Sequence, residues 1–441
     1  MRARLFCRRR PFASKSFPRS AWWLLPTRPF GSLGACITRN MVINSQIANS
    51  SDSNTQGQQI SSSLASLFLS FLKLGATAFG GPAMVPYIGK MAVEQKRWLS
   101  DQTFRDGVAL CQTIPGATAM QAAAYVGFRA RGVAGAAASF IGFGLPAFLL
   151  MVALSALYSR SHSVPWVVSI FSGLQTVVVA LVANATLSFG KTSLKGVRDA
   201  VIAAFAAGMF GLGTSPILVI LLAALLGLVL YKSDSLPRLG VSSAGQSSSA
   251  RAVLTIALIA GLSFVLLFLF ERKLFDLAAI MFRIDLFAFG GGFASVPLMF
   301  HEFVEVRFWL DAQTFLNGIA LGQITPGPIV ITATFVGYMV YGLIGAMVAT
   351  VGVFLPSFLI VVGVVPYFDR VRNSIYFTKA IHAILCSFVG LLFTVTVRFA
   401  ANISWDVPRV ALAAAALVAL LFKVEIIWIV LVGTLVSVFL L

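Results

Sequence analysis

The feature that most constrains this sequence is that it repeats itself. The run Ala78-Phe79-Gly80-Gly81 recurs 210 positions later as Ala288-Phe289-Gly290-Gly291. Further identities follow in the same order at offsets of 210 or 211, and among them are Trp98, Gln112, Pro115-Gly116, Gly132 and Leu145-Pro146. Shared hydrophobicity alone would not keep glycines, prolines and a tryptophan in register, so the chain contains two copies of one unit.

The composition places both copies in a membrane. Of the 441 residues, 58% are hydrophobic and 11% are charged, whereas a soluble protein carries about 25% charged residues. The apolar residues form runs of about 18 or more, the length that a helix needs to span a bilayer. These numbers exclude a water-soluble globule, a disulfide-stapled secreted domain and a disordered chain.

The net charge of +18 does not indicate a nucleic-acid partner. Half of the excess lies in residues 1–40, which contain nine Lys or Arg and no Asp or Glu. The other charges lie mostly between apolar runs, as in the loops of a membrane protein, and no basic face interleaved with aromatic residues is present. The four cysteines and three histidines are scattered without ligand spacing, so we expect no metal and no other cofactor.

Residues 1–63 are expected to form a basic and polar extension outside the repeats. Residues 1–40 are rich in Arg, Ser and Pro and Met41 follows them, which fits either an organelle-targeting peptide or a start codon assigned too early. Residues 44–63 are rich in Ser, Asn and Gln without an apolar period, so we expect disorder there. The extension is assigned no part in the chemistry.

The apolar pattern divides the rest of the chain into three parts. Residues 64–231 are the first membrane repeat, 232–274 a Ser/Gly-rich linker with one unmatched helix, and 275–441 the second membrane repeat. Each repeat is predicted to contain a first helix, a charged connector, an apolar segment broken by Pro-Gly, two long helices and two shorter apolar stretches. The first helices are predicted over 64–88 and 275–299, the connectors over 89–105 and 300–314, and the broken segments over 106–128 and 315–340.

We predict an all-α polytopic membrane protein whose two homologous repeats are inverted relative to each other, with broken or re-entrant helices. The connector of the first repeat is the more basic one; it holds Lys90, Lys96, Arg97 and Arg105, whereas the second holds Arg307. This asymmetry places the connectors on opposite sides of the membrane. Arg129 and Arg131 follow the broken segment 106–128. If that segment is a re-entrant hairpin, both basic clusters share one side, and the sequence leaves the number of crossings open.

A cation occupies the same place in both first helices. Lys73 lies six residues before Phe79, and Arg283 lies six residues before Phe289. Intramembrane cations are costly, normally face a cavity and mark a substrate path. The alternative is that both side chains snorkel to the membrane surface. Because the cation is repeated, we favour a binding role.

Helix-breaking residues recur as well, at Gly80-Gly81 and Gly290-Gly291, and at Pro115-Gly116 and Pro326-Gly327. Broken helices expose backbone N–H groups at a positive dipole end, which attracts anions, and transporters place such breaks at a repeat interface. Suitable donors surround the breaks: Gln112, Thr113, Thr118, Gln121, Gln323, Thr325, Thr332 and Thr334. We predict that this set binds a tetrahedral oxyanion. The alternative is that Gly and Pro only permit close packing.

Each connector also carries an acid, Glu94 in the first repeat and Glu305 in the second. Both precede a tryptophan that suits the membrane interface. A gating or proton-coupling role is one interpretation, and a solvated connector is the other.

These residues together resemble the chromate ion transporter family in its long, two-repeat form. The resemblance rests on Phe-Gly-Gly-Pro at 79–82, Arg-Trp-Leu at 97–99, Pro-Gly at 115–116 and Gln-Ile-Thr-Pro-Gly-Pro at 323–328, and it covers about 60–441. It implies a transporter that moves chromate outward, with sulfate as the isosteric relative and a proton gradient as the driving force. Ala117 and Gly292 depart from the prolines of the family pattern, and Ala117 weakens the expectation that both broken segments bind equivalently.

We therefore predict a secondary transporter of tetrahedral oxyanions, most concretely chromate efflux driven by protons, and no enzyme activity. Lys73 and Arg283 would supply positive potential, while the breaks and Gln112, Gln323 and Thr325 would bind and orient the anion. Its partners would be the oxyanion, the lipid bilayer of the plasma membrane and, as a possible homodimer, a second copy; an organelle membrane applies if residues 1–40 are a targeting peptide. Uptake of sulfate or another oxyanion, a passive anion channel and a membrane-embedded transferase stay open as alternatives. The dispersed histidines argue against the transferase.

Overall fold

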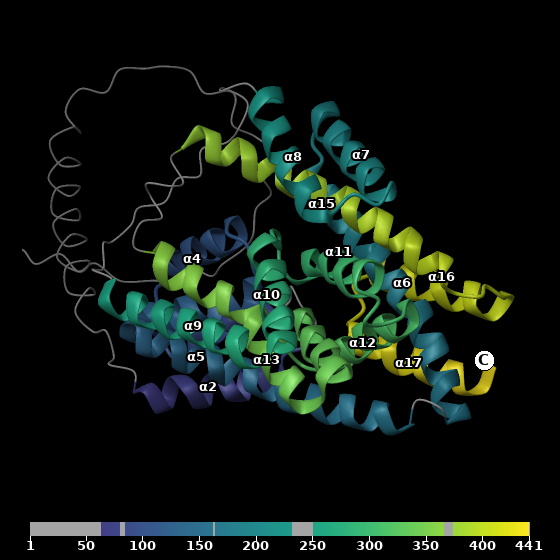
Figure 1. Cartoon of the computed structure of the whole chain (residues 1–441), viewed down its shortest axis with the longest axis horizontal. Coiled ribbons are helices and arrows are strands. Elements are labelled where there is room, and N and C mark those ends of the chain that lie inside the picture. The colour runs from purple at the N-terminus through teal and green to yellow at the C-terminus, as the bar shows by residue number, and fades with distance from the viewer. Residues whose placement is uncertain (1–62, 80–83, 162–163, 232–249, 366–373, 441) are drawn as a thin grey trace, which may run out of the picture. The chain divides into compact units, whose positions relative to one another are not determined.

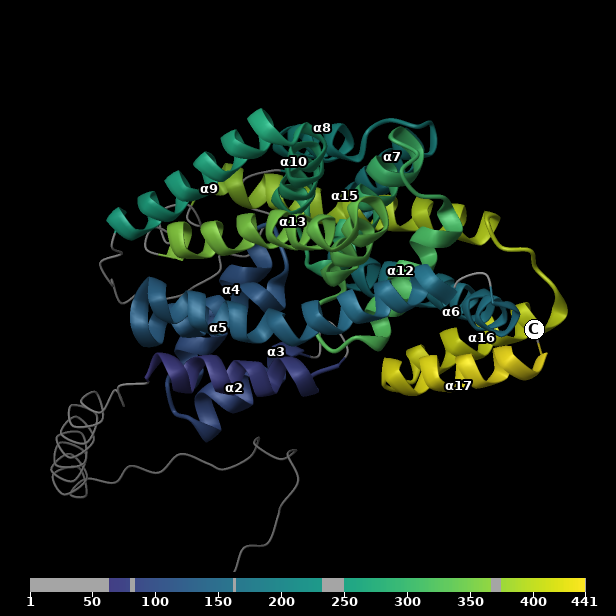
Figure 2. The same cartoon turned by 60° about the horizontal axis from the view of Figure 1, so that its bottom comes forward.

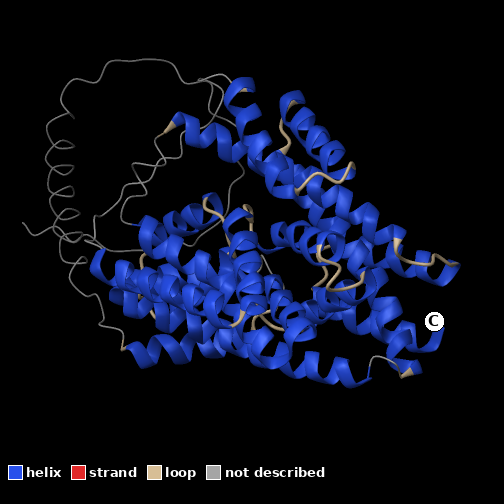
Figure 3. Ribbon diagram, viewed as in Figure 1, coloured by secondary structure: helices blue, strands red, loops and turns tan. Residues whose placement is uncertain are grey.

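The computed structural model describes residues 63–79, 84–161, 164–231, 250–365 and 374–440. Residues 1–62 of the predicted extension, and Gly80-Gly81 of the predicted site, lie outside the described residues. Every regular element within the described ranges is helical, as Figure 3 shows. This confirms the prediction of an all-α protein.

Each predicted first helix is in fact a helical hairpin, so the expectation of continuous helices over 64–88 and 275–299 was wrong. In the first repeat α2 (Leu64–Thr77) is followed by the short α3 (Met84–Gly89) and the wide-turned η2 (Lys90–Gln95). The rings of Phe71 and Trp98 stack with centroids 6.4 Å apart, so the chain returns along α2. The reason is that residues such as Gly290-Gly291, both at positive φ, cannot continue a helix.

The second repeat shows the same hairpin with a charged closure. It consists of α10 (Arg272–Phe287), η3 (Gly292–Ala294), α11 (Ser295–Phe300) and η4 (His301–Val306). Arg283 on α10 forms an ion pair with Glu302 on η4, which only a returning chain permits. The predicted connectors thus begin as helical turns, η2 and η4, rather than as irregular loops.

The segments broken by Pro-Gly are re-entrant hairpins. In the first repeat α4 (Asp101–Thr113) leads to a tip and then to α5 (Thr118–Ser161). Tyr125 donates its hydroxyl to the Thr103 carbonyl at 3.2 Å, so the first part of α5 runs back along α4. A second reversal follows inside α5 at Gly132, where φ is +63°. In the second repeat α12 (Ala312–Ile324), η5 (Ile329–Ile331) and α13 (Thr332–Val364) repeat this path, with the reversal at Gly342.

The re-entrant hairpins limit the number of helices that can cross the membrane, which the sequence left open. A helix of 13 residues such as α4 is about 20 Å long, too short for a hydrocarbon core of about 30 Å. Five helices within the described ranges are long and apolar enough to cross: Thr118–Ser161, Pro165–Ser193, Val253–Phe270, Ile329–Val364 and Ile375–Ala401. Because each hairpin starts and ends on one face, the basic connector of the first repeat shares a face with Arg129 and Arg131.

The two repeats are inverted, as predicted. The long helices α6 (Pro165–Ser193) and α15 (Ile375–Ala401) occupy equivalent places in the repeats and pack together. The hydroxyls of Thr186 and Thr396, which are equivalent residues, lie 3.3 Å apart. Gly190, one turn further along α6, faces Val389, which lies earlier on α15, so the helices are antiparallel. The unmatched helix α9 (Ala250–Phe270) adds one crossing between the repeats, so the second repeat begins on the opposite side of the membrane from the first.

The last hairpin of each repeat packs on the long helix of the other repeat. The helices α7 (Val197–Gly211) and α8 (Pro216–Leu230) pack on α15, whereas α16 (Val407–Leu421) and α17 (Ile426–Leu440) pack on α6. Figures 1 and 2 show both pairs beside the long helix of the opposite repeat. The repeats are therefore interleaved, and neither has a complete core of its own.

Candidate functional site

The tips of the hairpins meet between the repeats. The Gly116 N–H, at the tip of the first repeat, donates to the Ala288 carbonyl of the second repeat at 2.8 Å. Its equivalent, the Gly327 N–H of the second repeat, donates to the Ala78 carbonyl of the first at 3.1 Å. We call this place the tip crossing, and it comprises residues 78, 115–118, 288–292 and 326–330. The predicted breaks described by the structure are thus brought together at one site.

Glycine is required where the tips touch their neighbours. Gly116 has φ +117°, and a Cβ there would lie 2.1 Å from the Ser357 Oγ. Gly327 has φ +119°, and its Cβ would lie 2.7 Å from the Ala147 Cβ. L-residues avoid this region of φ, and no space is left for a side chain. The backbone of the first tip therefore packs directly on α13, and that of the second tip packs on α5.

Two helix N-termini face the loop at Gly290–Gly292. A Cβ on Gly291 would lie 3.3 Å from Oγ1 of Thr118, the first residue of α5, and one on Gly292 would lie 2.5 Å from the Ile329 Cγ2 at the start of η5. The first N–H groups of a helix have no partner within the helix and lie at its positive dipole end. The N–H groups of Gly116 and Gly327 are bonded to carbonyls in this conformation, so the donors offered to an anion are those of the first turns.

A buried carboxylate touches the tip of the first repeat. Asp285 on α10 has no exposed surface. Its Oδ2 accepts the backbone N–H of Ser357 at 2.8 Å and the Ser357 hydroxyl at 2.7 Å. The Ser357 Oγ in turn accepts the Ala117 N–H at 2.9 Å. One hydroxyl therefore connects an acid of the second repeat to Ala117, the residue just before α5 of the first repeat.

Three buried side-chain atoms in the described part of the chain have no hydrogen-bond partner: Gln121 Oε1, Asp285 Oδ1 and Gln323 Nε2. Each lies within six residues of a tip, and the Gln121 Nε2 donates to the Pro115 carbonyl at 2.5 Å. Buried polar groups normally find partners, because leaving one unpaired costs about 1–3 kcal/mol. Unmet donors and acceptors gathered at one place indicate a site that a polar ligand or proton completes.

The predicted cations differ in their surroundings. Arg283 pairs with Glu302, which is 6% exposed and also binds Arg307. Lys73 is exposed and takes part in none of the ion pairs found among the described residues. The position equivalent to Glu302 is Met91, which cannot neutralise it. The cation of the first repeat is uncompensated, and that of the second repeat is held by an acid.

The two connector acids also differ. Glu305 forms an ion pair with Arg398, and its Oε2 lies at hydrogen-bond distance, 3.0 Å, from the His301 Nδ1. Arg398 additionally donates to the Phe210 carbonyl at 2.6 Å, so Glu305 joins η4 to the end of α7. Glu94 is exposed. The position equivalent to Arg398 is Ser188, which explains why the first repeat lacks this network.

The remaining predicted residues divide in the same way. Gln323 contributes a buried amide to the tip crossing, whereas its equivalent Gln112 is exposed on α4. Thr325 is buried and donates its hydroxyl to the Leu321 carbonyl of its own helix. Pro326 is buried and Pro115 half-buried at the tips.

Sequence reasoning missed Asp285 and Ser357. The search compared what the two repeats share, and these residues stand where the first repeat has Gly75 and Ala147. The available signal was an acid inside an apolar run, which is costly in a membrane and therefore marks function.

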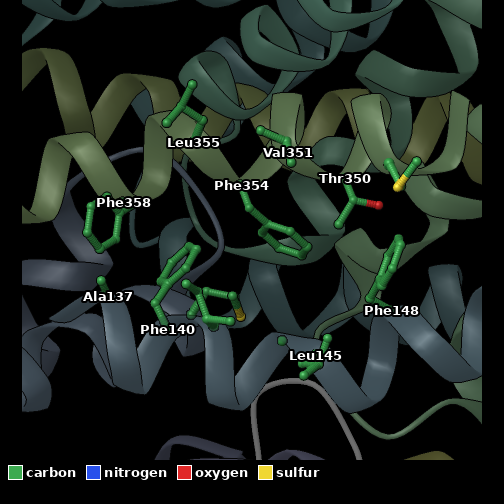
Figure 4. Close-up of a pocket in the computed structure, with 13 residues that line it drawn as sticks. Ala137, Phe140, Leu145, Phe148, Thr350, Val351, Phe354, Leu355 and Phe358 are labelled. Atoms are coloured by element: carbon green, nitrogen blue, oxygen red, sulfur yellow. The ribbon is translucent and has the colours of Figure 1, made fainter. Parts of the chain in front are cut away.

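An apolar cavity of about 500 Å³ lies beside the tip crossing, between α5 and α13. Its walls are symmetric: Phe140, Leu145 and Phe148 of α5 face Val351, Phe354 and Phe358 of α13 (Figure 4). The Thr350 hydroxyl in its lining is already bonded to Thr334 and to the Ala346 carbonyl. The cavity offers a charged solute almost no polar group to bind, so we do not place the anion site there.

One cluster has ligand atoms suited to a metal ion. Ligand atoms of Asp199, His382 and Cys386 lie within 4.8 Å of one another. Both oxygens of Asp199 are already occupied, by the backbone N–H groups of Lys195 and Gly196 and by Tyr231 and His382. The equivalent pair in the other repeat, Arg409 and Ser172, also forms hydrogen bonds. The cluster therefore connects α7, α8 and α15 by hydrogen bonds, and we call it the Asp199 clamp. The other repeat has different hydrogen-bonded residues at the equivalent positions.

Inverted repeats, re-entrant hairpins and helix N-termini converging on a buried polar centre define a multi-pass membrane protein of the transporter class. Comparison of the sequence agrees, since the family model described as chromate transporter matches residues 65–228 and again 275–438. The chain belongs to the chromate transporter family.

The relatives cover most of the chain. An uncharacterised transporter of Methanocaldococcus jannaschii is 45% identical over 78% of this chain and 86% of its own length. The chromate transport protein of Cupriavidus metallidurans is 31% identical over 82% of this chain and 88% of its own, and that of Pseudomonas aeruginosa is 32% identical over 82% and 87%. No solved structure matches the chain.

Proposed function

We propose that this protein exports chromate across the plasma membrane as a secondary transporter driven by the ion gradients of the cell. The observation that carries the proposal is a charge difference between equivalent positions of the repeats. In the second repeat Arg283 forms an ion pair with Glu302, whereas in the first repeat the equivalents are Lys73 and the uncharged Met91. The first-repeat face attracts a dianion, and the second-repeat face releases it because its cation is already neutralised. Relatives named as chromate transport proteins support the choice of substrate.

The direction follows from which face is cytoplasmic. The first-repeat face carries Lys90, Lys96, Arg97, Arg105, Arg129 and Arg131, and Lys/Arg-rich loops lie in the cytoplasm. The anion is therefore loaded from the cytoplasm. The membrane potential favours its exit, because each elementary charge moved is worth about 2.3 kcal/mol per 100 mV.

In this proposal the anion moves along the re-entrant hairpins to the tip crossing. Lys73 attracts it, and the first turns of α5 and η5 receive it together with the amide of Gln323. Passage to the second face needs a change of conformation, since Gly116 and Gly327 pin the tips to the opposite repeat. Arg283 and Glu302 then form the last charged contact before release.

The test is transport by purified protein in proteoliposomes loaded with chromate or with labelled sulfate. We expect chromate efflux that accelerates with the membrane potential and that Lys73→Gln reduces at least tenfold. Arg198→Gln removes another exposed cation, at the start of α7, and should leave the flux unchanged. Sulfate flux without chromate flux would replace the substrate, and flux at channel rates that no gradient concentrates would contradict a carrier.

A further inference from the structure

We infer that Asp285 is the proton-binding group of this transporter, and that its proton moves with the anion rather than in exchange for it. The inference rests on the proposed function and names the regulation of the same site. It starts from one atom, the Asp285 Oδ1, which is buried without a partner at the tip crossing.

Asp285 has few donors around it: Ser357 provides both hydrogen bonds within normal distance, and the Ala117 N–H also interacts with the carboxyl. Both hydrogen bonds from Ser357 end on Oδ2. An ionised carboxylate needs donors on both oxygens when it is buried, because burial of an unmet charge is expensive. A proton on Oδ1 removes the charge and leaves the bonds to Oδ2 in place. The geometry therefore suits a group that alternates between the two states.

The groups around Asp285 do not compensate its charge. The packed helix α13 contains no Asp, Glu, Lys, Arg or His over Thr332–Val364, and neither does α11. The packed helix α9 carries Arg251, near its start. Helix α10 itself carries Asp276 and Arg283, and its first two residues, Arg272 and Lys273, lie more than three turns before Asp285. Arg283 is already paired with Glu302. No described cation is thus placed to hold Asp285 ionised.

The position of Asp285 sets the sign of the coupling. Two hydrogen bonds through the Ser357 hydroxyl join it to the Ala117 N–H, at the start of α5 where the anion is proposed to bind. A carboxylate and a dianion this close in a medium of low dielectric constant repel each other strongly. Binding of the anion therefore raises proton affinity, and protonation raises anion affinity by the same factor. Proton and anion bind together, which is the thermodynamic basis of co-transport.

The first repeat cannot perform this step. Its equivalents of Asp285 and Ser357 are Gly75 and Ala147, and Gly75 packs so closely on α5 that a Cβ would lie 2.2 Å from the Phe143 carbonyl oxygen. One proton site serves the whole pair of repeats. We therefore expect one proton to accompany each anion.

The experiment uses full-length protein in proteoliposomes at a clamped membrane potential, with chromate inside and a pH gradient of either sign. Acid on the chromate side should accelerate efflux, by up to about tenfold per pH unit for one proton. Asp285→Asn, which resembles the protonated state, should still transport but should vary less than about twofold with pH. Glu425→Gln, which removes an exposed acid just before α17, should keep the wild-type response.

Two outcomes would overturn the inference while leaving the proposed function intact: acceleration by acid on the side opposite to chromate, which indicates exchange, or an unchanged pH response in Asp285→Asn. Absence of chromate flux in the wild type under every gradient would instead reject the proposed function. Should Asp285→Asn fail to fold, wild-type protein still decides. At pH 8, efflux should withdraw protons from the vesicle lumen one for one with chromate, and a lumen that gains protons rejects co-transport.

Discussion

The hydroxyls of Thr186 and Thr396 lie 3.3 Å apart at equivalent places in the two repeats. A residue can contact its own equivalent only where the symmetry axis passes between them. Since α6 and α15 are antiparallel there, the axis is perpendicular to helices that cross the membrane, which is the arrangement of inverted repeats. The same symmetry explains why each tip binds the opposite repeat.

This contact predicts a specific cross-link. With the native cysteines replaced, Thr186→Cys combined with Thr396→Cys should form a disulfide under mild oxidation, because the two side chains already meet. Thr394 bonds to the Ala207 carbonyl on α7, so Thr186→Cys with Thr394→Cys should not. Mass spectrometry of the oxidised protein checks both, and equal yields in the two pairs would contradict the direct contact of Thr186 with Thr396.

The tip of the first repeat should not tolerate a side chain. Gly116→Ala forces an unfavourable φ and a clash with Ser357, and we expect at least 2 kcal/mol of destabilisation, roughly as for strained backbone combined with overpacking, with loss of chromate flux. Gly208→Ala is the matched control, because nothing lies within 4 Å of a Cβ there and alanine favours its helix. Thermal unfolding in detergent compares them. Equal melting temperatures would refute the close approach.

The two equivalent cations, Lys73 and Arg283, should respond differently to removal. Arg283→Gln leaves the buried Glu302 with Arg307 alone, and we expect a loss of about 1–3 kcal/mol that Glu302→Gln in the same chain partly restores. Lys73→Gln should reduce transport with little effect on stability, since no ion pair is broken. Melting curves and flux assays of the three variants separate the cases. A larger loss of stability for Lys73→Gln would contradict the assigned asymmetry.

The Asp199 clamp should depend on pH. Burial alone would raise the pKa of this carboxyl, but hydrogen bonds from Tyr231 and the Lys195 N–H, with His382, outweigh it and hold the pKa below the usual value. A depressed folded-state pKa adds stability that is present above about pH 4 and is lost as the pH falls through the folded value. Asp199→Asn should therefore lower the melting temperature at neutral pH. Its difference from wild type should shrink on acidification, and a difference that grows would reverse the sign.

Much of the fold was predictable from residues with special backbone conformations. Gly290 and Gly327 permit positive φ and Pro326 lacks an N–H donor, so a break at these clustered residues could be read from the sequence. Single prolines such as Pro146 and Pro356 lie inside helices and do not mark one. The predicted first helix over 64–88 failed because hydropathy measures burial and not direction, and a hairpin is as apolar as a straight span. Periodicity likewise could not show that 106–128 returns to its starting face, whereas the contact of Tyr125 with the Thr103 carbonyl does.

The candidate site was predictable in part. Repetition identified Gln323 and the tips, yet it favoured Gln112 equally, and the structure leaves that amide exposed. A comparison of residues that are identical in both repeats cannot reveal Asp285, because the first repeat has Gly75 at the equivalent position. The pairing of Glu302 with Arg283 depends on η4 lying beside α10, and local sequence does not encode a contact between residues 19 positions apart.

By itself the sequence determined an all-helical membrane protein built from two copies of one unit, because composition, apolar length and repeated glycines and prolines act locally and need no knowledge of neighbours. Only the tertiary structure decided that the copies are interleaved, that five of the described helices are long and apolar enough to cross, and that the buried carboxyl of Asp285 lies at the meeting of the tips. Those properties depend on which backbones approach across some 200 residues of chain, where close packing and the pairing of buried polar atoms, rather than local preference, select the arrangement.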